Sequence, residues 1–289
     1  MSLLDSEVTD AERNRELAIL FTRAYGTDGA SIVEALSNEL KGIRRRILLL
    51  LSCVYDRQVM DRVRDHLFLR STQHTANALE TLELTLGPTL ARKVIPIFEE
   101  GSNDHGGLLL SPTALPPEEG LGHVIGDPAG GHSTWTRALA VRLSIGNPTG
   151  ATTSHMQVAA EDTHPVVREA AAHVGPHRVG PEPEATSARG IPSPSLFDHT
   201  TSSASDTMLT TIERILTLKS VDIFSETEDG TLIDIATILE EVPAEAGTTI
   251  IHKGDVGACM YIIHDGRVRV HDGDQVFAEF AEGEIFGEL

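Results

Sequence analysis

Residues 126–133 have the glycine spacing of a phosphate-binding loop. Four residues separate Gly126 from Gly131, and Ser133 follows at the position whose hydroxyl holds magnesium in such loops. However, His132 occupies the position of the lysine that reaches the phosphates, and no strand is predicted before the loop. We consider three interpretations of the function: a regulatory sensor, an interaction scaffold and an enzyme that uses the Gly126 loop. The enzyme therefore ranks last.

Other reactive residue types are scattered along the chain rather than grouped. His173 and His177 have the spacing of a helical metal pair, but Gly175-Pro176 interrupts any helix between them. Neither Cys53 nor Cys259 has a second cysteine or a histidine at ligand spacing, so we expect both to be reduced core residues. The run Arg44-Arg45-Arg46 is typical of a solvated helix face. We expect no catalytic residue, no metal site and no cofactor.

The segment from Ala246 to Leu289 alternates short β-type runs with glycine turns. The runs Thr248 to Ile251, Met260 to Ile263 and Val268 to His271 are rich in β-branched or aromatic residues. Asp265-Gly266 is a hairpin signal, since glycine tolerates the positive φ of tight turns. This pattern predicts a compact antiparallel β-roll.

This segment resembles the cyclic-nucleotide-binding domain of catabolite-activator proteins and protein kinase A regulatory subunits. The matching residues are Ala246-Gly247, Lys253-Gly254-Asp255-x-Gly257, Met260-Tyr261-Ile262-Ile263, Gly266, Gly283 and Phe286-Gly287-Glu288-Leu289. The resemblance implies that the last four, Phe286, Gly287, Glu288 and Leu289, bind the ligand. By the same resemblance, Glu288 accepts a hydrogen bond from the ribose 2′-hydroxyl, and the amides around Gly287 and Leu289 face the phosphate.

In that family an arginine about one helical turn further on pairs with the cyclic phosphate. The sequence stops at Leu289, before that position and before the closing strands and the lid helix. We therefore expect a fragment of a larger protein, cut within the phosphate-binding cassette.

The chain of 289 residues is acidic, with a net charge of −20. Residues 201–289 contain 5 basic and 18 acidic residues, which disfavours a nucleic-acid surface because such surfaces need clustered Lys and Arg. No N-terminal signal-peptide pattern is visible in the sequence. The apolar run from Ile47 to Tyr55 is much shorter than the about 20 residues of a membrane span.

The first hundred residues predict successive amphipathic helices. Thr9-x-x-Glu12 and Ser31-x-x-Glu34 have the spacing of capping boxes, and Asp56 is placed to cap a third helix. A fourth helix should end at Gly87-Pro88, and a fifth should follow to Glu100. Residues 116–124 predict a further short helix.

Two passages in the helical part resemble HEAT repeats. Trp135 to Ala140 and His164 to Ala171 look like HEAT helices, in which a proline enters the helix and an arginine and small residues follow. With residues 55–56 and 76–80, they resemble bacterial proteins that join a transporter-like membrane domain to HEAT repeats and a cyclic-nucleotide domain. That resemblance leaves open a membrane domain before Met1.

We therefore predict a multidomain α+β protein, a HEAT-like helical region followed by an incomplete antiparallel β-roll of the cyclic-nucleotide-binding fold. The expected parts are a HEAT-like region (1–100), a Gly/Pro-rich linker with a short helix (101–132), a HEAT-like helix pair (133–175), a flexible linker (176–205) and the truncated cyclic-nucleotide-binding domain (206–289).

The predicted function is regulatory and non-catalytic. A cyclic nucleotide, cyclic AMP rather than cyclic GMP, would bind the complete roll and shift the flanking helices. A protein partner would use the HEAT-like surface, and the location would be cytoplasmic, with no membrane span in this chain. The alternative is a protein-interaction scaffold whose roll has lost its ligand.

Overall fold

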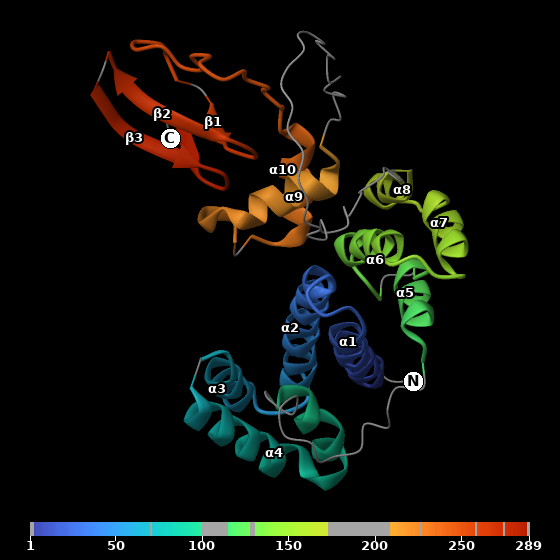
Figure 1. The fold of residues 1–289 in the computed structure, drawn as a ribbon. Helices are drawn as coiled ribbons and strands as arrows, with labels where there is room; N and C mark the ends of the chain where they lie inside the picture. Colours follow the sequence, from blue (N-terminus) through green and yellow to red (C-terminus); the bar gives the residue numbers. More distant parts are fainter. Residues whose placement is uncertain are drawn as a thin grey trace, which may run out of the picture. The chain divides into compact units, whose positions relative to one another are not determined.

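The computed structural model describes residues 3–69, 71–99, 115–127, 131–172, 209–225, 227–257, 259–273 and 275–287 (Figure 1). The chain divides into two compact units, Met1–Ala172 and His173–Leu289. Most of the two predicted linkers, the pair His173 and His177, and both Glu288 and Leu289 lie outside the described residues. Within the described residues, no helix has both the length and the apolar character that a membrane span requires.

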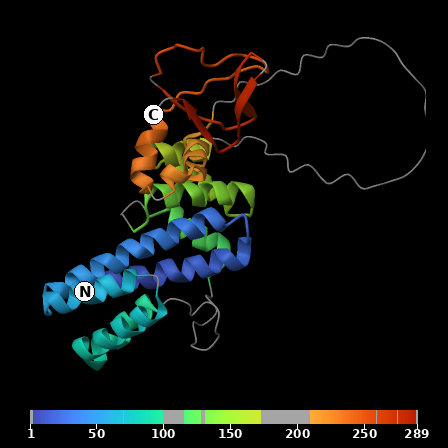
Figure 2. The ribbon, with the colours of Figure 1, turned by 90° about the vertical axis from the view of Figure 1, so that its left-hand side faces the viewer.

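The first unit begins with four helices around one apolar core. These are α1 (Leu3–Tyr25), α2 (Ala30–Ser52), α3 (Arg57–Phe68) and α4 (Thr72–Phe98). Helices α1 and α2 pack along their lengths, as Figure 2 shows, and α3 lies along α4. The core combines apolar residues of all four helices, among them Ala11, Ile47, Met60 and Leu82.

Some predicted helix boundaries are confirmed. The carboxylate of Asp56 accepts hydrogen bonds from the amides of Gln58 and Val59 at the start of α3. Gly87 has φ 71° and interrupts the helical backbone of α4, so the predicted break before Pro88 is present as a kink. The short helix is α5 (Pro117–Ile125).

Both predicted capping boxes in the first two helices are wrong. Thr9 lies inside α1 and donates its hydroxyl to the carbonyl of Asp5, one turn back. Helix α2 begins at Ala30, so Ser31 is already helical and the N-cap is Gly29, with no side-chain cap. A hydroxyl residue can serve either role, because its local hydrogen bonds also form within a helix.

The three arginines of the 44–46 run make separate intramolecular contacts. Arg44 donates to the carbonyl of Ile97 at 2.7 Å, Arg46 pairs with Glu7 at 2.8 Å, and Arg45 lies over the ring of Phe68. The Arg44 contact satisfies a carbonyl at the end of α4 that has no partner within the helix. These contacts agree with the expected helix face and explain the run without a ligand.

The rest of the first unit is formed by α5, α6 (Thr134–Gly146), α7 (Thr152–Ala160) and α8 (Pro165–Ala172). Helix α5 packs closely on α1, since a Cβ at Gly120 would lie 2.9 Å from a methyl of Leu20. Residues 133–172 form three helices rather than the expected pair. Helix α6 is almost entirely buried. The guanidinium of its Arg137 forms an ion pair with Asp162, which precedes α8.

In the described part of the second unit, two α-helices precede the strands. Helix α9 (Thr211–Ser220) begins with a complete capping box of Thr210 and Glu213, followed by a 3₁₀ turn (Asp222–Phe224) and α10 (Asp229–Ile238). The strands are β1 (Met260–Ile262), β2 (Arg267–Asp272), β3 (Gln275–Ala281) and β4 (Ile285–Gly287). They form two antiparallel pairs, β1 with β4 and β2 with β3.

The β-region differs from the sequence-based expectation at three points. Residues 248–251 are not a strand. Asp265-Gly266 turns the chain between β1 and β2, which do not pair, and the hairpin instead joins β2 to β3 after Asp272-Gly273. Both cysteines are free and exposed rather than buried, because Cys53 follows the end of α2 and Cys259 precedes the short strand β1.

Candidate functional site

The pairing of β1 with β4 positions the start of the candidate site. Met260 pairs with Gly287, Tyr261 with Phe286 and Ile262 with Ile285. Of the four residues predicted to bind ligand, Phe286 and Gly287 therefore lie at the end of β4. The binding roles of all four remain predictions, because Glu288 and Leu289 lie outside the described part of the chain.

Phe286 belongs to a small aromatic cluster of the roll. Its ring stacks on Tyr261 of β1 at a centroid distance of 5.0 Å and an interplanar angle of 13°. It also lies 6.3 Å from the ring of Phe280 on β3. Aromatic pairs of this kind contribute about 0.5–1.5 kcal/mol to stability beyond area burial. Through these two contacts, Phe286 joins the β1–β4 pair to β3 of the other pair. The sequence pattern predicted the position but not this packing role.

Gly287 is the most constrained backbone position of the site. Its φ of 103° is unfavourable for any residue with a side chain. In addition, a Cβ there would lie 2.6 Å from the carbonyl oxygen of Cys259 and 3.2 Å from the ring of Tyr261. Strand β1 and the residue before it therefore close directly over Gly287.

The turn before β4 is held by backbone and side-chain hydrogen bonds. The amide of Ile263 donates to the carbonyl of Glu284, and the amide of Gly283 donates to the carbonyl of Ile263. The carboxylate of Glu284 accepts from the amide of Ala281 at 2.6 Å. These contacts fix the turn from β3 into β4 and hence the register of Phe286 and Gly287.

Helix α9 is tied both to α10 and to the strand region. Arg214 donates to the carbonyls of Ala236 and Leu239 and pairs with Glu241. The hydroxyl of Thr217 lies 2.9 Å from Nδ1 of His264, the residue that follows Ile263. His264, which lies shortly after β1, is thus in hydrogen-bond contact with α9.

No arginine of the described second unit lies beside Gly287. Arg214 is committed to the end of α10, while Arg267 and Arg269 are exposed on β2, opposite Ala281 and Glu279 of β3. The remaining cations, Lys219 and Lys253, pair with Asp229 and Asp272. The strand pairing therefore supplies backbone geometry at this site rather than a positive side chain.

The phosphate-loop spacing has a structural explanation in the first unit. The carboxylate of Glu39, on α2, accepts from the amide of Ser133 at 2.7 Å and from the hydroxyl of Thr136 at 2.6 Å. Its other oxygen lies 3.0 Å from Nδ1 of the buried His132. Burial raises the pKa of Glu39, but hydrogen bonds from His132, Thr136 and Ser133 outweigh it, so the pKa is lowered. An internal carboxylate thus occupies the position at the start of α6 where a phosphate would bind.

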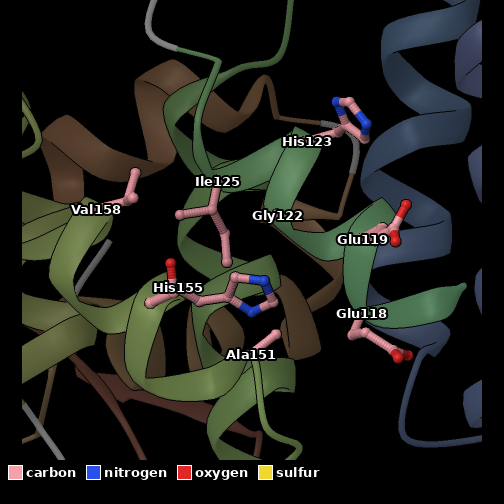
Figure 3. Close-up of a pocket in the computed structure, with 9 residues that line it drawn as sticks. Glu118, Glu119, Gly122, His123, Ile125, Ala151, His155 and Val158 are labelled. Atoms are coloured by element: carbon pink, nitrogen blue, oxygen red, sulfur yellow. The ribbon is translucent and has the colours of Figure 1, made fainter.

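A cavity of about 360 Å³ lies between α5 and α7 (Figure 3). Glu118, Glu119, His123 and His155 are among its polar lining residues. Nδ1 of His155 lies 2.9 Å from the hydroxyl of Ser144, a distance typical of a base and its nucleophile. However, Ser144 is only 2% exposed, so no substrate can reach it. Burial lowers the pKa of His155, and the neutral ring serves as a core hydrogen-bond partner.

Comparison with known proteins identifies the roll. The family model for the cyclic nucleotide-binding domain matches residues 241–289. These residues form part of a cyclic nucleotide-binding domain. Similar proteins include a cyclic nucleotide-gated channel of Caenorhabditis elegans, 41% identical over 75 residues, and the alpha-3 channel of Homo sapiens, 39% identical over 75 residues. In the same range is the rod photoreceptor channel subunit alpha of Gallus gallus, at 39%.

These alignments cover 25% of this chain and 10%, 11% and 12% of the three channels. The chain therefore matches about a tenth of the length of these relatives. No solved structure matches the chain significantly. The finer comparison with catabolite activators and protein kinase A subunits stays a prediction, as does the HEAT-like character of the helical region.

Proposed function

We propose that this chain is the non-catalytic regulatory part of a cyclic-nucleotide sensor. The observation that carries the proposal is the match of residues 241–289 to the cyclic nucleotide-binding domain, together with the tight pairing of Gly287 against β1. In this proposal, Glu288 accepts a hydrogen bond from the ribose 2′-hydroxyl. The backbone amides around Gly287 and Leu289 face the cyclic phosphate, and Phe286 keeps β4 in place.

The proposed ligand is cyclic AMP rather than cyclic GMP, as the likeness to catabolite activators and protein kinase A subunits implies. The acidic surroundings oppose any anion, since the residues from 201 onward carry 18 acidic and 5 basic side chains. Phosphate binding must therefore rely on short-range hydrogen bonds from the backbone and on a dedicated cation.

The output is proposed to pass through the helices. The contact of Thr217 with His264 and the packing of Ser220 near Gly283 connect α9 to the segment before β4. A ligand that prefers one arrangement of β4 would shift the population of α9 positions by its differential affinity. The first unit would act as a HEAT-like surface for a protein partner, on the cytoplasmic side of a membrane if the whole protein contains a membrane domain.

The test is titration calorimetry with cyclic AMP, cyclic GMP and 2′-deoxy cyclic AMP. The protein used would be the full product of its gene, and wild type would be compared with Glu288→Ala. We expect binding of cyclic AMP, and a larger loss on substitution for cyclic AMP than for its 2′-deoxy analogue, because only cyclic AMP offers the hydroxyl.

Two outcomes separate the claims. Equal losses for both ligands would remove the ribose role from Glu288 while leaving the sensor in place. No binding of either cyclic nucleotide by the wild-type gene product would refute the sensor and favour the ligand-free interaction scaffold.

A further inference from the structure

Two histidines face each other across the α3–α4 corner of the first unit. His66 lies in the last turn of α3 and His74 in the first turn of α4, and three residues connect the helices. Their ring centroids are 5.2 Å apart, with an interplanar angle of 55°. Helices α3 and α4 pack side by side, so this contact is part of the helix pair (Figure 1).

Neither imidazole has a hydrogen bond or an ion pair within the residues that the structure describes. Neighbouring side chains of α3 have other partners. Arg64 pairs with both Asp61 and Asp65, and the ring of Phe68 lies beneath Arg45. His66 is partly exposed and His74 is exposed, so both rings are reachable from water. The ring nitrogens are therefore available to a ligand from solvent.

The ring spacing fits a shared metal ion. Imidazole nitrogens bind Zn²⁺ at about 2.0–2.1 Å in tetrahedral sites, which places each ring centroid about 3.2 Å from the ion. Two such rings at a tetrahedral angle have centroids about 5 Å apart. The observed 5.2 Å matches this value.

We propose that His66 and His74 together bind a divalent transition-metal ion, zinc foremost, that joins α3 to α4. Within the described residues, no group of three His, Cys, Asp or Glu side chains could hold a metal, so water would complete the coordination. The site is thus open and exchangeable, unlike a closed structural zinc site. The C-terminal end of α3 favours the added positive charge and the N-terminal end of α4 opposes it, so the two dipoles nearly cancel.

Binding at this site would stabilise the folded first unit. The two imidazoles are held together only when α3 and α4 are packed, so the metal binds the folded state more tightly than the unfolded chain. Above saturation, each tenfold increase in free Zn²⁺ should raise Tm by about 3–5 °C for a unit of this size. This inference does not depend on the proposed cyclic-nucleotide function.

The test follows thermal unfolding of the full chain, by circular dichroism of its helices, during titration with ZnCl₂. The variants are His66→Ala, His74→Ala and the double variant, with His123→Ala as a matched control because it is an exposed helical histidine of the same unit. We expect wild type and His123→Ala to be stabilised by zinc, and the other three variants to lose this stabilisation. An EPR spectrum with Cu²⁺ should show two coordinated nitrogens in wild type, and one in each single variant.

Zinc stabilisation of the same size in the double variant would overturn the proposal and place the metal elsewhere in the chain. The absence of stabilisation in wild type would overturn it as well. Loss in His123→Ala equal to that in His66→Ala would indicate scattered surface binding and would refute the pair as a site.

Discussion

Glu39 offers the sharpest test of how the first unit is held together. Its carboxylate accepts hydrogen bonds from the Ser133 amide and the Thr136 hydroxyl and contacts the buried His132, all at the start of α6. Hydrogen bonds to a charged group contribute about 1.5–3 kcal/mol each, and they are not additive in one cluster. A carboxylate at a helix N-terminus adds about 0.3–1 kcal/mol.

From these contacts we expect Glu39→Ala to lower the free energy of unfolding by about 3–4 kcal/mol, because it also leaves His132 buried without its partner. Glu39→Gln keeps an acceptor for Ser133 and Thr136 but loses the charge, so the expected cost is about 1–2 kcal/mol. The control is Glu119→Gln, an exposed carboxylate on α5 with no ion pair among the described residues, which should change stability by less than about 0.5 kcal/mol.

The assay is urea unfolding followed by the fluorescence of Trp135, the single tryptophan of the chain, which is 1% exposed and lies in the first turn of α6. The pH dependence provides a second check. The pKa of Glu39 is lowered in the folded state, so its ionised form stabilises the fold above its ordinary value of 4.5, and this stability is lost as pH falls through the folded pKa. The difference between wild type and Glu39→Gln should shrink in that acidic range. Equal effects of Glu39→Gln and Glu119→Gln, or a difference that does not change with pH, would refute the reasoning.

Two further substitutions test the roll and the cavity. Gly287→Ala should lower the free energy of unfolding of the second unit by at least about 2 kcal/mol, because the new Cβ overlaps the carbonyl of Cys259. The control Gly230→Ala in α10 has open space around it and should be neutral or stabilising. Chemical unfolding measures both variants, and similar losses of stability would contradict the close approach of β1. Burial lowers the pKa of His155 below its ordinary 6.5, so its neutral form stabilises the fold above pH 6.5 and that stability is lost as pH falls from 6.5 toward the folded pKa. His155→Gln should therefore flatten the fall in stability between about pH 7 and 5, and an unchanged slope would show that the buried ring does not control it.

Local signals in the sequence predicted the features that depend on neighbouring residues. Asp56 caps α3 because an aspartate side chain reaches the amides two and three residues ahead, and Gly87 interrupts α4 because glycine adopts a positive φ at little cost. The capping boxes predicted at Thr9 and Ser31 are wrong because the pattern is only four residues long. Such a pattern does not distinguish the first turn of a helix from a later turn.

The contacts that fix the candidate site and the helical core are long-range, and sequence spacing does not encode them. Glu39 and Thr136 are 97 positions apart, so the loop before α6 could be judged only by its glycine spacing, which suggested a phosphate. Gly287 was recognised as part of a family pattern, but the reason for a glycine there is the carbonyl of Cys259, the residue that precedes the partner strand β1. The backbone before β1 and the aromatic ring of Tyr261 therefore constrain Gly287 at the end of β4, which the four-residue motif alone does not show. A substitution that loosens β1, and leaves residues 286–289 intact, should therefore weaken ligand binding as much as a change in the motif itself.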